Sequence, residues 1–281
     1  MSEFRDALGN IVQINENLGR IVSLSPSVTE ILFEIGIGSN LVGVSAFCKR
    51  PAETDQIRKV GSYGTAKLEV LDEMKPDIVL MMSGYSEPLY KKIREHYNAF
   101  LFKLPTTMFG ILELIKEVGI VTSHQERAKE LEYEMTRAIS NIKRFDIRGY
   151  LEIDLGGPVT FGSQSYIADT LSLFGIKQPY ENVQREWITP RDADIIEFDP
   201  EILIYEGKMY RGSSKHEARK LFSGRGYETS TFMKEDMIFT TPGKLDFFAH
   251  HGPSFFREVL PWLRNLMESV ASTTPPNGRS L

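Results

Sequence analysis

The sequence has only one cysteine, Cys48, so no disulfide can form within the chain. It also has no apolar run of about 18 residues, the length that a membrane-spanning helix needs. The amino terminus, MSEFRDALGN, lacks the basic region, apolar core and cleavage site of a secretory signal. Two locations stay open: the cytoplasm if Met1 is the native start, or an extracytoplasmic compartment if a signal was removed.

An excess of basic residues is missing as well. The chain has 33 Lys and Arg against 38 Asp and Glu, which gives a formal net charge of −5. Nucleic acids and anionic membranes are bound by clustered cations that displace counterions, so we expect neither as a partner. Small molecules and proteins remain.

Several catalytic motifs are also missing. The sequence has no phosphate-loop lysine motif, no GxSxG elbow, no HExxH and no paired-cysteine zinc spacing. The segment GIGSNL at 36–41 lacks the third glycine of a dinucleotide fingerprint and follows a predicted helix instead of a strand. We therefore expect a protein that is not an enzyme and carries no cofactor of its own.

Short apolar runs alternate with helix-period segments along the chain. Runs at 20–25, 41–45, 77–82 and 99–104 predict strands covered on both faces, as in a parallel sheet with crossover helices. A second series follows, with strands at 149–155, 201–205 and 236–240. The fold class that this pattern predicts is α/β, with two lobes at 1–122 and 147–271.

The segment SHQERAKELEYEMTRAISNIKR, at 123–144, contains neither Gly nor Pro and keeps apolar residues at helical spacing. Such a helix is about 30 Å long, more than a crossover inside one small sheet requires. We therefore predict a single helix linking the lobes over 123–146. The end of the chain, residues 272–281, is small, polar and proline-bearing, and is predicted to be disordered.

The stretch RIVSLSPSVTE places Ser25, Pro26 and Ser27 where a strand ends and a helix begins. In open α/β sheets, ligands gather at such ends, where helix amino termini present unpaired N–H groups. Two interpretations stay open. Ser25 can cap the helix while Ser27 is solvated, or both hydroxyls can face a ligand.

The chain resembles the solute-binding proteins of ABC importers for vitamin B12, haem and ferric siderophores. The resemblance covers nearly the whole chain, and its motifs are RIVSLSPSVTEILFEIGIGSNLVGVSAFCKRPAE, KVGSYGTAKLEVLDEMKPDIVLM, RGYLEIDLGGPVTFGSQSYIADTLSLFGI and WITPRDADIIEFDPEILIY. It implies two α/β lobes joined by one long helix, with the ligand in the cleft between lobes. Aromatic side chains suit that role because corrinoids, haems and catecholates offer wide apolar faces. It implies these ligand-binding residues: Ser25, Ser27, Phe47, Tyr63, Tyr85, Phe161, Gly162, Trp187, Glu206 and Phe247.

The resemblance also implies a docking carboxylate on each lobe, which pairs with an arginine of the permease. Glu69, seven residues before Pro76, matches the first position. Seven residues before Pro200 stands Ala193 instead, flanked by Asp192 and Asp194, which are the substitute candidates.

The function that we predict is capture of a metal chelate by a monomeric receptor for delivery to an ABC importer permease. The alternatives are a receptor for a metal or a molybdate-like oxyanion, or a chelatase-like enzyme of similar architecture. The adjacent His250 and His251 are weak candidates for an axial metal ligand, since imidazole suits cobalt and iron.

Overall fold

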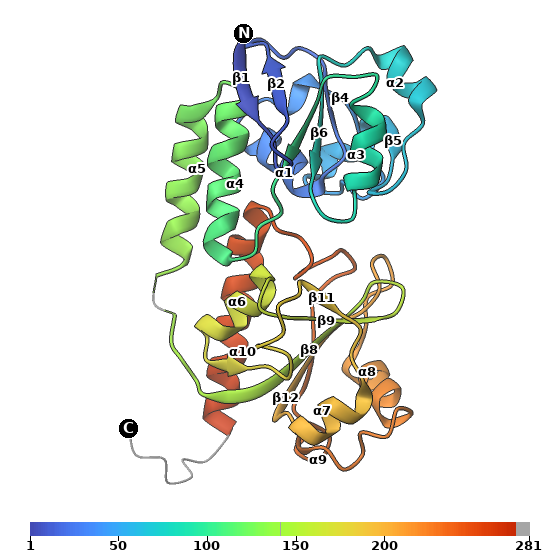
Figure 1. Ribbon diagram of the computed structural model, residues 1–281. Helices are drawn as coiled ribbons and strands as arrows, with labels where there is room; N and C mark the ends of the chain where they lie inside the picture. Colours follow the sequence, from blue (N-terminus) through green and yellow to red (C-terminus); the bar gives the residue numbers. More distant parts are fainter. Residues whose placement is uncertain (141, 274–281) are drawn as a thin grey trace. The chain divides into compact units, whose positions relative to one another are not determined.

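The computed structural model describes residues 1–140 and 142–273, and the chain folds into two compact units (Figure 1). Unit 1 comprises Met1–Pro105, Phe109–Arg137 and His251–Pro253. Unit 2 comprises Thr106–Met108, Ala138–His250 and the described residues from Ser254 onward. Each unit has its own mainly parallel sheet flanked by helices, which confirms the predicted α/β class.

The sheet of unit 1 has the strand order β5-β4-β3-β6-β7, and every neighbouring pair is parallel. Crossover helices cover both faces of such a sheet, so strands β3, β6 and β7 are buried throughout and nearly all of their residues are apolar. The strands are β3 (Ile21–Ser23), β4 (Leu41–Ser45), β5 (Lys59–Gly61), β6 (Ile78–Met82) and β7 (Ala99–Phe102). The helices are α1 (Pro26–Glu34), η1 (Gly38–Asn40), η2 (Ala52–Gln56), α2 (Leu68–Met74), α3 (Glu87–Ile93), α4 (Met108–Val121) and α5 (Gln125–Ala138).

A small antiparallel hairpin, β1 (Ser2–Arg5) with β2 (Ile11–Ile14), precedes this sheet and was not predicted. The buried Asp6 carboxylate holds its turn by accepting the backbone N–H groups of Leu8 and Asn10. The same carboxylate accepts the Tyr90 hydroxyl, and the Ala7 N–H donates to the Leu101 carbonyl at 2.8 Å. The hairpin is thereby joined to β7, the edge strand of the sheet.

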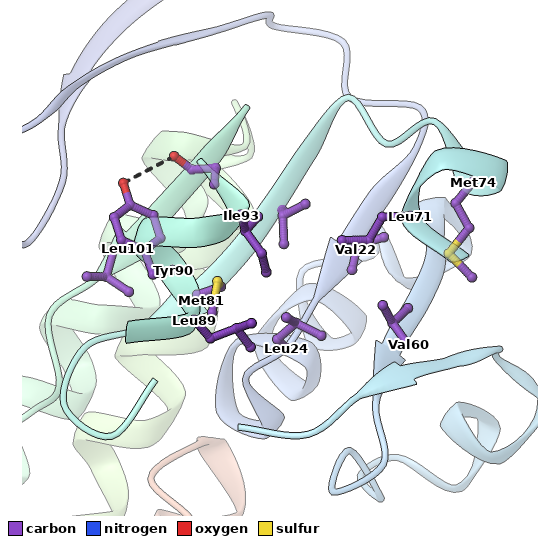
Figure 2. Close-up of a cluster of buried hydrophobic side chains, with 12 residues drawn as sticks. Val22, Leu24, Val60, Leu71, Met74, Met81, Leu89, Tyr90, Ile93 and Leu101 are labelled. Atoms are coloured by element: carbon purple, nitrogen blue, oxygen red, sulfur yellow. Dashed lines mark hydrogen bonds between the residues drawn. The ribbon is translucent and has the colours of Figure 1, made fainter. Parts of the chain in front are cut away.

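One face of the unit 1 sheet packs against α2 and α3 (Figure 2). Side chains from β3, β6 and β7 meet those of the two helices in a continuous buried cluster. Its labelled members are Val22, Leu24, Val60, Leu71, Met74, Met81, Leu89, Tyr90, Ile93 and Leu101. The Tyr90 hydroxyl, which donates to the Asp6 carboxylate, also lies 3.5 Å from the Ala99 carbonyl oxygen, the contact that the dashed line in Figure 2 marks.

Helices α4 and α5 lie side by side in unit 1 (Figure 1). Ser123, between them, adopts a left-handed conformation with φ of 60°, which reverses the chain. The helices approach so closely that a Cβ on Gly119 would lie 2.2 Å from the Ala128 Cβ. Glycine at this position is what permits the pairing.

The single long helix predicted over 123–146 is not confirmed. In the structure, α5 has 14 residues, or about 20 Å, and it ends at Ala138. The Arg264 Nη2 donates to the carbonyl oxygens of Ala138 and Ser140, at 3.1 and 3.3 Å, and so occupies acceptors that a longer helix would use. The apolar spacing after Ala138 therefore overestimated the helix length.

The sheet of unit 2 has the order β11-β9-β8-β12-β13, and β10 pairs with the start of β8. Strands β8, β12 and β13 are mutually parallel. At one edge, β9 runs antiparallel to its two neighbours, β8 and β11. The strands are β8 (Ile147–Asp154), β9 (Pro158–Phe161), β10 (Ile176–Lys177), β11 (Trp187–Ile188), β12 (Ile202–Glu206) and β13 (Ile238–Thr240). The helices are α6 (Tyr166–Leu173), α7 (Asp192–Phe198), α8 (Lys215–Ser223), α9 (Thr231–Lys234), the π-helical turn η3 (Phe255–Val259) and α10 (Leu260–Thr273).

The tail predicted to be disordered begins inside α10, because Ser272 and Thr273 are helical. Residues 274–281 lie outside the described part of the chain. Within residues 1–140 and 142–273, no helix is both long enough and apolar enough to cross a bilayer.

A charged group is buried in unit 2 against an aromatic cluster. Glu152 is 2% exposed, and its Oε1 accepts the Arg225 Nη1 at 2.7 Å. The other Glu152 oxygen accepts the Tyr150 hydroxyl at 2.5 Å. The Arg225 guanidinium also reaches Asp192 and lies 4.8 Å above the Phe222 ring. The negative charge of Glu152 is therefore balanced by the Arg225 guanidinium, and both of its oxygens accept hydrogen bonds. The network connects β8 to the start of α7.

We predict that Arg225→Met lowers the free energy of unfolding by about 3–5 kcal/mol, because Glu152 would remain buried without its counter-charge. Urea denaturation followed by circular dichroism measures this change. The matched control is Arg219→Met, which removes an exposed arginine of α8 whose partner is Asp236 and should cost less than about 1 kcal/mol. Equal effects of the two substitutions would contradict this assignment.

Candidate functional site

The serines of the opening motif surround the amino terminus of α1. Ser25 is the N-cap, and its hydroxyl accepts the Val28 N–H at 3.4 Å. Ser23 is engaged as well, since its hydroxyl accepts the Thr29 hydroxyl at 2.8 Å. Ser27 differs: its Oγ is buried and makes no hydrogen bond within the described residues. Of the two serines predicted to bind ligand, Ser25 has a structural partner and Ser27 keeps its hydrogen-bonding capacity.

Three of the predicted aromatic residues come together in unit 1 and form what we call the ring cluster: Phe47, Tyr63 and Tyr85. They follow β4, β5 and β6, whose carboxyl ends lie at one edge of the parallel sheet. Phe47 and Tyr63 stack with ring centroids 5.1 Å apart and planes inclined by 22°. Tyr85 extends the cluster, because its Cε1 would lie 3.0 Å from a Cβ on Gly64, the residue after Tyr63.

The ring cluster is accessible to a ligand. Tyr85 is 68% exposed, and Phe47 and Tyr63 are half-buried. An exposed aromatic side chain loses little conformational entropy when a flat apolar molecule covers it. The arrangement can therefore bind an extended ring system by stacking.

In unit 2, Phe161, Gly162 and Trp187 also lie together. Phe161 in β9 is directly opposite Trp187 in β11, and a Cβ on Gly162 would lie 2.4 Å from the Val183 carbonyl oxygen. Phe161 is buried at 3% exposure, whereas Trp187 is 44% exposed. The structure therefore makes Phe161 and Gly162 the support for this edge, and Trp187 its accessible side chain.

Glu186, which was not predicted as a site residue, adjoins Trp187. Burial raises the pKa of its carboxyl group to about 7, and a hydrogen bond from the Trp187 side chain opposes the rise. No sequence signal distinguishes this glutamate from the other carboxylates of the chain, since the shift arises from the surrounding fold.

The carboxylate of Glu206, the last residue of β12, accepts hydrogen bonds from the protein backbone. Its Oε1 accepts the Phe247 N–H at 2.9 Å and its Oε2 accepts the Phe248 N–H at 2.7 Å. The side chain is 2% exposed, and burial raises its pKa to about 7 against the opposing effect of these N–H donors. Glu206 therefore positions the segment that carries Phe247 and Phe248, and its predicted contact with ligand stays a prediction.

Phe247 is also a packing residue in the structure, at 5% exposure. Its ring makes edge contacts with Phe248 and Trp262, at centroid distances of 5.7 and 5.6 Å. Trp262 lies on α10 and is half-buried. Phe247 was predicted as a ligand-binding residue, whereas Trp262, its packing partner, was not predicted as part of the site.

The two helices predicted to carry docking carboxylates have the same local frame. Each ends in a left-handed residue followed by proline: Lys75, with φ of 45°, after α2 and Asp199, with φ of 48°, after α7. An arginine side chain caps each end, since Arg20 Nε donates to the Met74 carbonyl at 2.7 Å and Arg148 Nε donates to the Asp199 carbonyl at 2.9 Å. Matching the helices from this end makes their second residues, Glu69 and Ala193, equivalent.

The carboxylates on these helices differ in what they contact. Glu69 is exposed and forms no hydrogen bond or ion pair with the described residues. Asp192 accepts the Arg225 guanidinium at 2.5 Å and the Tyr227 hydroxyl at 2.8 Å. Asp194 accepts the Tyr180 hydroxyl at 3.0 Å. Both aspartates that flank Ala193 are therefore engaged within unit 2.

The two candidate metal-ligating histidines, His250 and His251, are both buried, at 2% and 9% exposure. Across residues 1–140 and 142–273, no group of three or more His, Cys, Asp or Glu side chains is arranged to hold a metal ion. Cys48 is buried too, with its Sγ 3.1 Å from the Thr29 Oγ1.

A cavity of about 660 Å³ in unit 2 contains none of the predicted site residues. Its lining includes five charged side chains, those of Arg144, Asp146, Asp169, Lys177 and Glu181. Lys177 and Asp146 already form an ion pair at 2.6 Å. With no aromatic ring in its lining, this cavity does not match a flat apolar ligand.

We predict that Glu206→Gln flattens the pH dependence of stability. Between about pH 4.5 and pH 7 the unfolded state ionises this carboxyl while the folded state keeps the proton, so the free energy of unfolding falls as pH rises. The difference of roughly 2.5 pKa units corresponds to about 3 kcal/mol, lost by pH 8 in the wild type.

Urea denaturation at about pH 5 and about pH 8 measures this difference. Glu197→Gln, at an exposed position of α7, is the matched control and should behave as the wild type does. If Glu206→Gln and the wild type lose the same stability between these pH values, the folded carboxyl ionises normally and the prediction is wrong.

The chain matches the family model described as "Periplasmic binding protein" over residues 21–245. Among curated relatives, the vitamin B12-binding protein of Photorhabdus laumondii is 24% identical over 197 residues, which is 67% of this chain and 70% of the relative.

Two solved structures show the same fold. A possible iron-binding (periplasmic solute-binding) protein from Staphylococcus epidermidis has a TM-score of 0.74 at 24% identity, and the match covers 89% of this chain and 98% of that one. The molybdate periplasmic binding protein of a Haemophilus influenzae ABC transporter has a TM-score of 0.75 at 15% identity, over 96% and 92% of the two chains. The family match spans most of the sequence and confirms the resemblance seen there: the chain belongs to the periplasmic binding protein family.

Proposed function

We propose that this protein is a receptor that captures a metal chelate with an extended apolar face and delivers it to an ABC importer. The ring cluster carries this proposal, because three aromatic side chains at one sheet edge offer a stacking surface for an extended ring system. The vitamin B12-binding relative is consistent with such a ligand. The protein acts as a monomer on the extracytoplasmic side of the membrane and performs no chemistry on its cargo.

The roles of the predicted residues follow from their exposure. Phe47, Tyr63 and Tyr85 contact the ligand in unit 1. In unit 2, Phe161 and Gly162 support the edge that presents Trp187, and Glu206 holds the segment that carries Phe247. We call Ser23, Ser25 and Ser27, at the amino terminus of α1, the serine edge. It adds a polar contact to the ligand through the Ser27 hydroxyl.

A second candidate is an oxyanion receptor. The buried Ser27 hydroxyl has no partner in the described chain, and the first turn of α1 has no acidic residue to repel an anion. The molybdate-binding structure has the same fold, although at 15% identity. This candidate needs only the serine edge and leaves the exposed rings without a role, so we favour the chelate.

We predict that Tyr85→Ala weakens chelate binding by about tenfold to a hundredfold, because a stacked ring contributes roughly 1–3 kcal/mol. Titration of intrinsic tryptophan fluorescence with cyanocobalamin, haemin and a ferric hydroxamate measures the affinities. Tyr133→Ala on α5 is the matched control, since Tyr133 is 67% exposed and Tyr85 is 68% exposed. Molybdate is the additional titrant.

Three outcomes separate the candidates. Loss of affinity in Tyr85→Ala but not in Tyr133→Ala supports the chelate receptor. Binding of molybdate and of none of the chelates favours the oxyanion receptor instead. A chelate that binds equally to both variants means that the ring cluster is not the binding surface.

A separate prediction concerns docking. We expect Glu69→Arg to impair uptake through the cognate importer and to leave ligand affinity unchanged, because Glu69 is exposed and unpaired within the described residues. Reconstituted transport and direct titration measure the two quantities. Glu95→Arg, at another exposed position of unit 1, is the control for the charge change. A loss of ligand affinity in Glu69→Arg would mean that Glu69 belongs to the ligand-binding surface, and would contradict its docking role.

A further inference from the structure

A tight turn of unit 1, residues 62–65, follows β5 and carries one ring of the ring cluster. The chain closes on itself here, because Gly61 forms an antiparallel bridge with Ala66. The Ser62 N–H donates to the Thr65 carbonyl at 2.7 Å, and the hydroxyls of these two residues lie 2.8 Å apart. A Cβ on Gly61 would lie 1.9 Å from the Thr65 carbonyl oxygen, so the closure requires glycine at that position. The backbone of this turn is therefore fixed.

Tyr85, another member of the ring cluster, lies in a second fixed turn, between β6 and α3. Its neighbour Gly84 is left-handed, with φ of +89°, and the Gly84 N–H donates to the Glu87 carboxylate at 3.0 Å. The Ser83 N–H donates to the Phe102 carbonyl of β7 at 2.8 Å. These hydrogen bonds fix the backbone beside Tyr85, whereas its side chain is 68% exposed. The position of the ring therefore depends on what the side chain itself contacts.

The Tyr85 ring contacts the first turn at Gly64. The three heavy atoms nearest to a Cβ on Gly64 all belong to Tyr85: Cε1 at 3.0 Å, the hydroxyl oxygen at 3.6 Å and Cζ at 3.7 Å. Carbon atoms in ordinary contact lie about 3.5–4.0 Å apart, so the Cβ of an alanine would overlap the ring. The ring thus occupies the space that a side chain at position 64 would fill.

The conformation of the turn does not call for glycine at position 64. Gly64 lies outside the left-handed region of φ that Gly84 adopts, so an alanine there incurs no left-handed strain. This distinguishes Gly64 from Gly61, where backbone atoms leave no room for a Cβ. What the missing side chain of Gly64 provides is room for the ring of Tyr85.

We infer that Gly64 is a positioning residue: because it lacks a Cβ, it seats the Tyr85 ring next to Tyr63 and so completes the ring cluster before a ligand arrives. The inference rests on the proposed function, and the residue that it adds acts through Tyr85 instead of through a ligand contact. A side chain that is already seated loses less rotamer freedom on binding than one that rotates freely. A Cβ at position 64 would displace the ring, and binding would then have to immobilise it again.

The test is a double-mutant cycle on the full chain, with Gly64→Ala, Tyr85→Ala and the double variant. The probes are cyanocobalamin, haemin and a ferric hydroxamate, each titrated by intrinsic tryptophan fluorescence. Gly157→Ala, in the turn between β8 and β9, is the matched control, because a Cβ there meets no atom within 4 Å and this glycine is not left-handed either. Urea denaturation of every variant measures stability separately.

We expect Gly64→Ala to weaken binding of the chelate that the wild type binds by about threefold to tenfold, the range for immobilising one further side chain. The urea midpoint should not fall, because an exposed ring can move aside at little cost. In the Tyr85→Ala background, Gly64→Ala should have no further effect on affinity, since the ring that it displaces is absent. Gly157→Ala should bind as the wild type does.

Two binding results would overturn the inference and leave the receptor function in place. One is unchanged affinity in Gly64→Ala while Tyr85→Ala binds weakly. The other is an equal loss from Gly64→Ala in both backgrounds, which would mean that position 64 acts on the ligand or on the fold directly. A lowered urea midpoint in Gly64→Ala would also overturn it, because the glycine would then serve the turn. Failure of the wild type to bind any of the three chelates would overturn the proposed function and the inference with it.

Discussion

The parallel strands in the middle of each sheet are buried on both faces, and this burial limits where a solute can reach the chain. Strands β6, β7 and β12 are buried along their whole length, so none of their faces is open to a solute. Accessible side chains can then gather only where the strands end and the chain turns. The ring cluster and the serines at the amino terminus of α1 both occupy such ends in unit 1.

The two units use one local frame for different chemistry. In both, an arginine caps a short helix whose last turn ends in a left-handed residue and a proline. In unit 1 this frame carries Glu69, which forms no hydrogen bond or ion pair with the described residues, and the same unit holds the ring cluster. Unit 2 has Ala193 at the equivalent place, a buried Glu152–Arg225 pair beside it, and a buried Glu206 that holds a loop by its backbone. The shared frame makes Glu69 and Ala193 equivalent positions, and the alanine shows that the frame does not preserve the side chain.

Much of the architecture could be predicted because apolar runs report burial directly. The strands at 41–45, 77–82 and 201–205 lie within one residue of their observed bounds, since each is bounded by a turn or a helix start. The helix after Ser123 was overestimated because periodicity cannot register that Arg264, over a hundred residues later, occupies the carbonyl groups at its end. The hairpin at the amino terminus was missed because its fixed point, Asp6, depends on Tyr90, which is distant in sequence.

The residues of the candidate site show the same difference between what local sequence patterns predict and what depends on tertiary packing. Phe47 and Tyr85 follow strands that the sequence predicted, so their place at one sheet edge could be expected, whereas Tyr63 follows β5, which was not predicted, and was expected from the resemblance alone. The burial of Phe161, Glu206 and Phe247 depends on packing across unit 2 and was not expected. The raised pKa of Glu186 is likewise a tertiary effect that no local pattern records.

The most direct measurement of the central claim is an anomalous-difference map from crystals of the protein grown with a bound metal chelate. Our account predicts a single metal peak whose surrounding chelate lies against the rings of Phe47, Tyr63 and Tyr85. A peak located instead in the polar cavity beside Arg144 and Lys177, or a chelate that leaves all three rings uncovered, would contradict it.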